Sequence, residues 1–345
     1  MKKRIAICTP QTPFTRGGAE YLVDKLIEEL RKRGHEVDLL QVPVAHTPKV
    51  EMVINALTWR MLKIQDILGR DVDVVITTKF PAYLVKHPRK ILWLFHQFRG
   101  AYELFDTDCT HFRDDPESHY YRNLIQRMDT ALIPEHKKIF SLSKNVANRL
   151  LTNNKIQSEV LYGPPVLDGF YHRQYGDYLL YVGRFSANKR VRLVLETARQ
   201  APEVRFVLAG GGEEYEPLKA LAGRWCLNNV EFLGYVPTEK ILRLYADARA
   251  VIYTPLDEDY GLVPLEAFMA RKPVLTTSDS GGILELVKDK ETGIICPPSP
   301  TELGQRARQL ARDEASVESM GRRAEKWARE IGWDRCIERL EAHFE

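Results

Sequence analysis

Short apolar runs alternate with amphipathic, helix-like stretches along the whole chain, and this alternation most constrains the fold. The runs of the first half are RIAICTP, EVDLLQV, VDVVITT, ILWLFHQ, KIFSLSK and SEVLYGPP, and those of the second half are YLLYVGR, RFVLAGG, VEFLGYV, AVIYTP, PVLTTS and GIICPP. Runs that are this apolar and β-branched are typical of parallel strands buried on both faces. Their alternation with stretches such as AEYLVDKLIEELRKRGH and ILRLYADAR predicts doubly wound α/β sheets.

The chain of 345 residues is longer than a single hydrophobic core usually supports, so two domains are expected. A stretch rich in Gly, Pro and polar residues, YGPPVLDGFYHRQYGD at 162–177, separates the two sets of strands. We therefore predict two Rossmann-like domains, residues 1–165 and 166–332. Because ligands bind at the carboxyl ends of such strands, the domains should face each other across a cleft.

Composition places the chain among ordinary globular proteins, with 44% hydrophobic and 28% charged residues. No apolar run approaches the ~20 residues of a membrane span, and the basic start MKKRIAICTPQTPF predicts a first strand in place of a signal peptide. The five cysteines are scattered without a CxxC pair. Reduced thiols and a cytoplasmic location are therefore expected.

Charge is divided unevenly between the two halves. Residues 1–165 carry 25 Lys and Arg against 19 Asp and Glu, a net +6, and the remainder carries 25 against 28, a net −3. A basic first domain is compatible with an anionic acceptor or with peripheral contact at the inner face of a membrane. Ordinary solvated surface charge is the alternative, and no nucleic-acid partner is expected.

Three of the loops that follow predicted strands carry groups suited to a phosphate or a reaction centre. Gly17 and Gly18 open a helix, where glycine allows close backbone approach and the helix start offers N–H groups to a phosphate. Arg184 and Lys189 also precede a helix, and two cations there suit a diphosphate. His96 ends the strand WLFHQ, although a lone histidine is more often structural.

The fourth loop, DEDYGLVPLEAFMARK, places two glutamates around a turn. The backbone N–H groups of Gly261, Leu262 and Val263 precede Pro264 and have no helical partners, so they could contact a phosphate. Glu258 lies on the loop, and Glu266 is expected in the first helical turn, where it could merely complement the helix dipole. Carboxylates repel phosphate but accept hydrogen bonds from sugar hydroxyls, so the two acids would flank the diphosphate and bind sugars.

The spacing Glu258-x7-Glu266 resembles the EX7E motif of retaining GT-B glycosyltransferases, notably family 4. Further segments that look like this family follow in the same order: GGAE, SLSKNVANRLL, VGRFSANKR, GGGEEYEPLKALA, VEFLGYVPTEKILRLYADA, SGGILELV, TGIICPP and GWDRCIERLEAHF. The resemblance implies a GT-B fold. It also implies that the last helix, 333–345, packs back on the first domain.

The resemblance also implies a role for each matched residue. Glu266 would bind the ribose of the donor nucleotide, and Glu258 the hydroxyls of the transferred sugar. Arg184 and Lys189 would bind the diphosphate, with Gly18 approaching it from the first domain. His96 would lie near the donor sugar and the reaction centre. The residues expected to touch the base are Tyr235 and Val236.

The expected function is therefore retaining transfer of a sugar from a nucleotide-diphosphate sugar to a glycan, glycolipid or small-molecule hydroxyl, which forms an α-glycoside. A UDP-sugar is favoured slightly over a GDP-sugar, and no cofactor is expected. The alternatives are a catalytically silent GT-B nucleotide-binding subunit and a GT-B sugar-nucleotide epimerase. Two Asp-x-Asp pairs, at 71–73 and 106–108, mimic a metal motif of another glycosyltransferase class. Neither lies near a nucleotide-binding pattern, so no metal is expected.

One segment has no counterpart in these patterns. The stretch FHQFRGAYELFDTDCTHFRDDPESHYYRNLI at 95–125 is aromatic, mixed in charge and unlike a strand. Core packing explains some of its aromatic residues. Its place directly after His96 also suggests a role in acceptor recognition.

Overall fold

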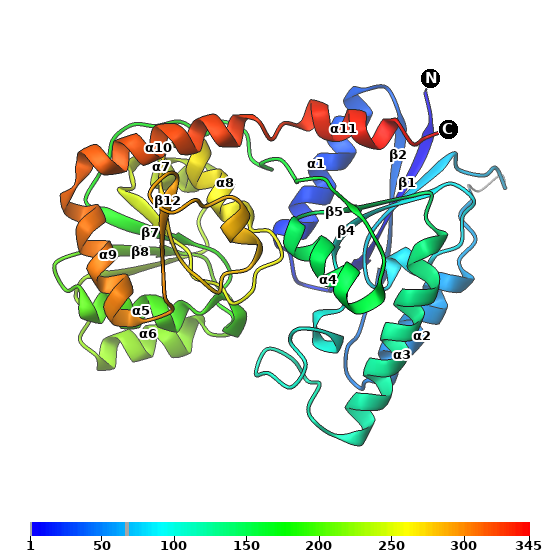
Figure 1. Cartoon of the computed structure of the whole chain (residues 1–345), viewed down its shortest axis with the longest axis horizontal. Helices are drawn as coiled ribbons and strands as arrows, with labels where there is room; N and C mark the ends of the chain where they lie inside the picture. Colours follow the sequence, from blue (N-terminus) through cyan, green and yellow to red (C-terminus); the bar gives the residue numbers. More distant parts are fainter. Residues whose placement is uncertain (1, 66–68) are drawn as a thin grey trace. The chain divides into compact units, whose positions relative to one another are not determined.

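The protein is described by a computed structural model that covers residues 2–65 and 69–345. The chain divides into two compact units (Figure 1). The first unit is Met1–Gly163 together with Gly332–Glu345, and the second is Pro164–Ile331. Each unit contains one six-stranded sheet flanked by helices, which confirms the predicted α/β class with two doubly wound sheets.

The first unit is built on strands β1 to β6. Their bounds are β1 (Arg4–Gln11), β2 (Glu36–Pro43), β3 (Val74–Lys79), β4 (Lys90–His96), β5 (Lys138–Ser141) and β6 (Glu159–Val160). The helices are α1 (Gly18–Lys32), α2 (Val50–Met61), α3 (Pro116–Leu132), α4 (Lys144–Asn154) and α11 (Trp333–Glu341), with 3-10 turns η1 (Ala82–Leu84), η2 (Arg99–Ala101) and η3 (Ile133–Glu135).

The second unit is built on strands β7 to β12. Their bounds are β7 (Tyr178–Val182), β8 (Arg205–Ala209), β9 (Val230–Gly234), β10 (Ala250–Ile252), β11 (Val274–Thr277) and β12 (Gly293–Cys296). The helices are α5 (Val191–Gln200), α6 (Tyr215–Arg224), α7 (Thr238–Asp247), α8 (Leu262–Met269), α9 (Pro300–Arg312) and α10 (Glu314–Arg329), with 3-10 turns η4 (Ala187–Lys189) and η5 (Gly282–Glu285).

Both sheets are parallel and reverse their winding once. The first has the order β2-β1-β3-β4-β5-β6, and the second has the order β12-β11-β10-β7-β8-β9. The winding therefore changes direction between β1 and β3 in the first unit and between β7 and β10 in the second. Ligands of doubly wound sheets bind outside the carboxyl ends of the strands at such a switch point.

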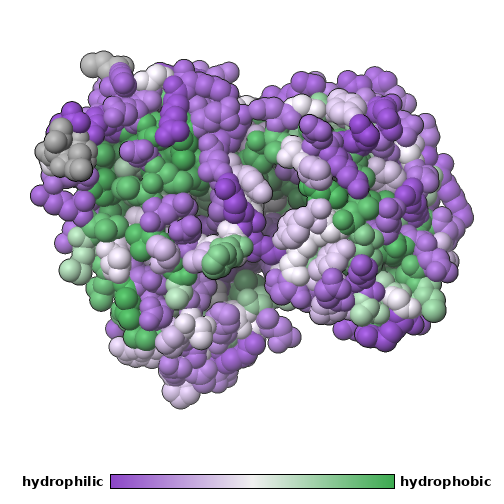
Figure 2. Space-filling model, turned by 180° about the vertical axis from the view of Figure 1, so that it is seen from behind, coloured by the Kyte–Doolittle hydropathy of each residue, from purple (hydrophilic) through white to green (hydrophobic). Residues whose placement is uncertain are grey.

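The central strands are buried on both faces, as their composition predicts. All residues of β3 are buried, and β4 is buried from Lys90 to Phe95, with His96 half-exposed at its end. On the face that Figure 2 shows, hydrophilic side chains cover much of the surface and apolar side chains form separate patches. The apolar runs of the sequence therefore form the cores that position the loops.

The C-terminal segment belongs to the first unit. Helix α11 contacts α1, and the Arg33 guanidinium beyond α1 donates to Asp334 Oδ1 at 3.0 Å and to Glu341 Oε2 at 3.3 Å. His35 Nε2 lies 2.8 Å from Glu341 Oε1. The helix ends at Glu341, short of the predicted end at 345, because the N–H groups of His343 and Phe344 donate to the carbonyls three residues back in place of four.

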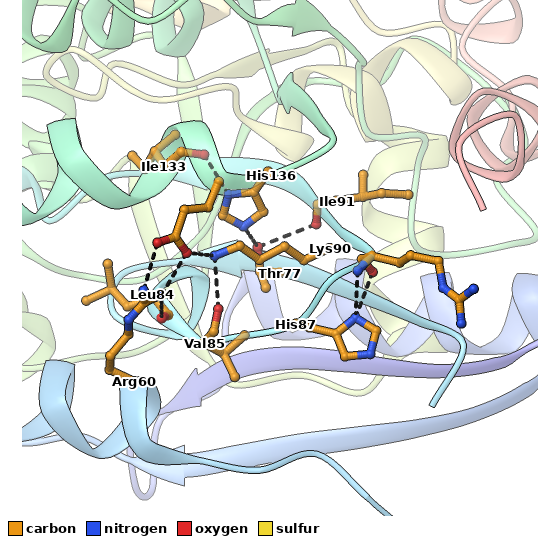
Figure 3. A network of polar contacts seen from close by, with 11 residues as sticks. Arg60, Thr77, Leu84, Val85, His87, Lys90, Ile91, Ile133 and His136 are labelled. Atoms are coloured by element: carbon orange, nitrogen blue, oxygen red, sulfur yellow. Dashed lines mark hydrogen bonds and ion pairs between the residues drawn. The ribbon is translucent and has the colours of Figure 1, made fainter. Parts of the chain in front are cut away.

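A polar network supports the amino end of β4 (Figure 3). The side chain of Lys90 is 1% exposed, and its Nζ donates to the Val85 carbonyl and to Glu135 Oε2, both at 2.9 Å. The Arg60 guanidinium donates to both oxygens of Glu135 at 2.7 Å. The hydrogen bonds from Arg60, reinforced by Lys90, lower the pKa of Glu135 to about 2.

The neighbouring histidine of this network is neutral. The His136 ring is buried, its Nδ1 lies 2.7 Å from the Ile133 carbonyl, and its Nε2 lies 3.0 Å from Thr77 Oγ1. A carbonyl can only accept, so Nδ1 carries the proton. Burial, reinforced by the charge of Lys90, lowers the pKa of His136 to about 3. The network lies at the start of β4, at the opposite end of the strand from His96.

Among residues 2–65 and 69–345, no helix has the length and apolar character needed to cross a bilayer.

Candidate functional site

The principal candidate site lies at the switch point of the second unit. Strands β7 and β10 are paired side by side, and the loops that leave their carboxyl ends carry residues 183–190 and 253–261. Arg184 and Lys189 therefore lie on one loop and Glu258 on the other. The two loops are joined directly by a hydrogen bond from the Leu256 N–H to the Asn188 carbonyl at 2.8 Å.

Lys189 and Glu258 form an ion pair across these loops. The side chains are 17% and 13% exposed, and Lys189 Nζ also lies 2.9 Å from the Tyr253 hydroxyl oxygen. The sequence assigned the two residues to different parts of the donor, and the structure brings them into contact. Tyr253, which positions the ammonium group, was not among the predicted site residues, because its only sequence signal is its place at the end of an apolar run.

A second cation, Arg190, ties the two loops together. It adopts a left-handed backbone conformation with φ of 49° and donates to both oxygens of Asp279 at 2.7 Å. It also donates to the carbonyls of Thr254 at 2.8 Å and Pro255 at 2.9 Å. A bidentate arginine holds its partners in a fixed geometry. Arg190 was not among the site residues predicted from VGRFSANKR, and its hydrogen bonds to the Glu258 loop are a finding of the structure.

The backbone of Glu258 is held by the segment Ser280-Gly281-Gly282. The Glu258 N–H donates to the Ser280 carbonyl at 3.1 Å, and the Gly282 N–H donates to the Glu258 carbonyl at 2.7 Å. A Cβ added to Gly282 would lie 2.3 Å from the Asp259 carbonyl oxygen, so the approach requires glycine. Gly281 has φ of 65°, which glycine adopts without strain. The SGG segment therefore fixes where the Glu258 loop runs.

Glu266 lies deeper than the sequence suggested. It is the fifth residue of α8, in the second turn and not the first as predicted, because the helix begins at Leu262. The residue is 8% exposed, and its Oε2 accepts a hydrogen bond of 2.8 Å from the Tyr245 hydroxyl on α7. Burial raises the pKa of Glu266, while the Tyr245 hydroxyl opposes that rise. Tyr245 was also missed, because 21 residues separate the two partners.

The start of α8 has backbone N–H groups for an anion. Gly261 is the N-cap residue with φ of 86°, no side chain caps the helix, and Leu262 and Val263 are its first two residues. The third residue, Pro264, has no N–H group. The first N–H groups of a helix have no partner within it, so this helix start can receive a negative charge.

The remaining predicted donor residues lie at the ends of β7 and β9. Arg184 is exposed, and its carbonyl accepts a hydrogen bond of 2.9 Å from the Tyr181 hydroxyl. Tyr235 is 83% exposed beside Gly211, where an added Cβ would lie 2.5 Å from the tyrosine ring. Val236 is half-buried next to it. An exposed ring held against a glycine backbone provides a flat apolar surface of the kind on which a base can stack.

At the switch point of the first unit, Glu20 accepts a hydrogen bond from a backbone N–H group that was expected to contact a phosphate. Gly17 is the N-cap of α1, and its N–H donates to Glu20 Oε2 at 2.8 Å. The other Glu20 oxygen accepts from Lys79 Nζ at 2.7 Å. The Gly17 N–H was expected to be open to a ligand, but the glutamate three residues later reaches back to it as in a capping box. Gly18 is the first helical residue.

His96 ends β4, as the sequence predicts. Its Nδ1 lies 2.6 Å from the Gln97 carbonyl, so Nδ1 carries the proton in the neutral ring. Part of the segment that follows packs in the core, with buried residues Ala101, Tyr102, Leu104 and Phe112. Buried Asp129 anchors it by accepting from Tyr102 at 2.7 Å. Core packing therefore accounts for more of this segment than its polar composition suggests.

The two Asp-x-Asp pairs have structural partners. Asp73 Oδ2 accepts from the Arg4 N–H at 2.8 Å, and Asp71 Oδ1 accepts from Gln65 at 2.7 Å. Asp106 Oδ1 accepts from the Asp114 N–H at 3.1 Å. Within the described part of the chain, no group of three or more His, Cys, Asp or Glu side chains could hold a metal ion.

Residues 172–327 match the family Glycosyl transferases group 1. This group 1 segment contains Arg184, Lys189, Glu258 and Glu266. An uncharacterized glycosyltransferase of Methanocaldococcus jannaschii is 23% identical over 201 residues, which are 58% of this chain and 57% of that protein. The human alpha-1,3/1,6-mannosyltransferase ALG2 is 29% identical over 161 residues, 41% of this chain and 38% of that protein. The matched part of the chain thus spans roughly two fifths to three fifths of these relatives.

The similarity of structure extends over both units. Sucrose-phosphate synthase from Thermosynechococcus elongatus has a TM-score of 0.79 at 17% identity, over 99% of this chain and 98% of that one. Anabaena HepE, solved in complex with UDP-glucose, has a TM-score of 0.72 at 16% identity, over 99% and 100%. The chain therefore has the GT-B fold that the sequence predicted, with the group 1 segment in its second unit.

Proposed function

We propose that this protein is a retaining glycosyltransferase of family 4, which moves a sugar from a nucleotide-diphosphate sugar to a hydroxyl and forms an α-glycoside. One observation carries the proposal: the group 1 segment places Lys189 and Glu258 in contact at the carboxyl ends of β7 and β10. Cations and carboxylates at a switch point suit a diphosphate joined to sugars on both sides. In this proposal the second unit binds the donor and the first binds a carbohydrate or glycolipid acceptor.

Each residue has a proposed role on the donor. Arg184, Lys189 and the N–H groups at the start of α8 bind the diphosphate. Glu266 accepts hydrogen bonds from the ribose hydroxyls, and the exposed Tyr235 ring stacks on the base. Glu258 leaves its ion pair with Lys189 when the donor binds, and then accepts hydrogen bonds from the transferred sugar.

In the proposed mechanism, the acceptor hydroxyl attacks the anomeric carbon from the same face as the departing nucleotide diphosphate. A covalent route needs a nucleophile beneath the anomeric carbon, and Glu258 would instead lie at the outer hydroxyls of the sugar. The departing phosphate oxygen would take the proton of the acceptor hydroxyl. Catalysis then depends on stabilising the charge that develops on the diphosphate. Arg184 and Lys189 would each contribute roughly 10²–10³-fold to turnover, the range of preorganised charge stabilisers.

The donor is proposed to be a UDP-sugar, with a GDP-sugar as the next choice. The complex of the similarly folded HepE with UDP-glucose supports this choice. A thermal-shift screen of UDP-, GDP- and ADP-sugars tests it, because a donor at a hundredfold its Kd adds about 2.7 kcal/mol to the free energy of unfolding.

Turnover of the same donors tests the reaction itself. A transferase hydrolyses its donor slowly when no acceptor is present. An epimerase would convert the donor sugar and leave the nucleotide attached, and a silent subunit would bind without turnover. Either of these two results would contradict the proposed function.

A further inference from the structure

Basic side chains gather at the carboxyl ends of the strands in the first unit. Lys79 ends β3 and His96 ends β4, and the two residues are register partners on these neighbouring parallel strands. Both side chains therefore emerge at the same edge of the sheet. This edge adjoins the switch point between β1 and β3, where a doubly wound sheet binds its ligands.

Aromatic contacts bring His46, and the segment that carries His111, to this edge. The Phe98 ring, two residues beyond His96, contacts three other rings. Its centroid lies 5.2 Å from that of His46, 6.0 Å from that of Phe80 and 5.4 Å from that of Phe112. Phe98 thus joins the β2–α2 loop, the end of β3 and the segment after η2.

Two further basic residues stand directly before these aromatic residues in the sequence. Lys79 precedes Phe80, and His111 precedes the buried Phe112. The loop that carries His111 is folded tightly onto this cluster, since a Cβ added to Gly100 would lie 2.4 Å from Thr110 Oγ1. The four segments that meet at Phe98 therefore each carry a basic residue: His46, Lys79, His96 and His111.

The charges that act on the most central histidine are all basic. Surrounding protein atoms displace water and lower the pKa of His46, although its side chain still contacts solvent, and the charges of His111, His96 and Lys79 lower it further. Lys79 is balanced by its ion pair with Glu20 on α1. An anion placed among the three imidazoles would reverse this repulsion, because it would favour their protonated forms and receive charge-assisted hydrogen bonds from them.

The side chains are accessible to a solute. His46 and His111 are exposed, and His96 is half-buried. The His96 ring holds its Nδ1 proton on the Gln97 carbonyl, so Nε2 becomes a second donor only when the ring gains a proton.

We propose that His46, His96 and His111 bind an anionic group, a phosphate or a carboxylate, of the acceptor. This inference rests on the proposed function, because it takes the first unit to be the acceptor side. It names the chemical class of the acceptor: a phosphorylated or acidic glycan or lipid in preference to a neutral sugar. The imidazoles take up protons from solution as the anion binds, and no covalent bond changes.

The test is an NMR titration of the full chain labelled in its histidine rings, with UDP present to occupy the phosphate site of the second unit. Inorganic phosphate is the first probe, and acetate is the second, each against chloride at equal ionic strength. We expect the ring signals of His46 and His111 to shift with saturation, and their titration midpoints to rise when the anion is bound. The probe that acts identifies the group as phosphate or carboxylate.

Substitution provides the matched comparison. H46Q/H111Q should bind the active probe about tenfold more weakly, the loss expected when hydrogen bonds to a charged group are removed. H119Q is the control, because His119 lies on the same segment but pairs with exposed Asp114 at 2.7 Å. Its affinity should be unchanged. The single variant H111Q replaces the double variant if the latter does not fold.

A response to neither anion, or one equal to that of chloride, would overturn the inference. Equal affinity in H46Q/H111Q and the unsubstituted protein would also overturn it. The titration measures anion binding and requires no turnover. Absence of donor turnover would therefore contradict the proposed function without affecting the anion-binding result.

Discussion

The network at the start of β4 predicts an asymmetry between two substitutions that break the same ion pair. E135Q removes the carboxylate and leaves Lys90 Nζ charged in a site where its side chain is 1% exposed. K90M removes the buried ammonium, and Glu135 keeps its two 2.7 Å hydrogen bonds from Arg60. Loss of the acid should therefore destabilise the first unit more than loss of the base.

The expected loss in the free energy of unfolding depends on which charge each substitution leaves without a partner. Breaking a buried pair by removing one partner costs about 3–5 kcal/mol. Glu135 is 36% exposed, so water reaches the site and E135Q should cost about 3 kcal/mol, the lower end of that range. K90M leaves the Val85 carbonyl without its donor but removes the desolvation of the ammonium, so it should cost about 1–2 kcal/mol. D24N is the control, because Asp24 on α1 forms an exposed pair with Arg16, and exposed pairs contribute little to stability.

Urea denaturation gives the free energies of unfolding, and hydrogen exchange of peptides that cover β3 and β4 assigns the loss to the first unit. If K90M were as destabilising as E135Q, or if E135Q were no more destabilising than D24N, Lys90 would not depend on Glu135 as its charge partner. Exchange rates in peptides of the second unit should not change in any of these variants.

Four further predictions concern acid stability, the donor site and metals. Acid should destabilise the first unit as pH falls from about 6.5 towards 3, because unfolded histidine has a pKa near 6.5 and folded His136 has one of about 3. H136Q should reduce the loss of unfolding free energy over this pH range. Calorimetry with UDP should show much weaker binding for E266A and nearly unchanged binding for E258A, which frees Lys189 from its ion pair; equal losses would reject the division of roles. Y245F should weaken UDP binding by about tenfold and move the loss of binding to higher pH, because without this hydroxyl the pKa of buried Glu266 rises further; an unshifted pH profile would argue against ionised Glu266 as the ribose ligand. Transfer should continue in EDTA, and loss of activity that Mg²⁺ or Mn²⁺ restores would show that a metal is required.

The strands were predictable because their signal is local. Each apolar run from RIAICTP to GIICPP overlaps one of the strands β1 to β12 to within a residue or is longer than it, and parallel strands buried on both faces require such runs. The ends were less predictable: KIFSLSK forms a strand only over Lys138–Ser141, and SEVLYGPP only over Glu159–Val160. His96 was placed correctly at the end of β4, since the end of the apolar run marks that position.

The partners of the site residues could not be predicted in the same way. Lys189 meets Glu258 across 69 residues, and Arg190 meets Asp279 across 89. Such contacts depend on the order of strands in the sheet, which periodicity does not fix. The left-handed conformation of Arg190 had no sequence signal, because non-glycine residues adopt it rarely. The sequence therefore named the charged residues of the loops, and the fold determined which of them meet.

The anomer of the first sugar released from a donor shows whether the configuration is retained, and this measurement needs no acceptor. The purified chain is incubated with an α-linked UDP-sugar, and proton NMR follows the anomeric signal of the free sugar before mutarotation. We expect the α-anomer to appear first. The rate of sugar release should be lost in K189A and R184A and unchanged in H119Q. Release of the β-anomer first would contradict retaining transfer. Near-normal rates in K189A and R184A would contradict the proposed stabilisation of the diphosphate by these two cations.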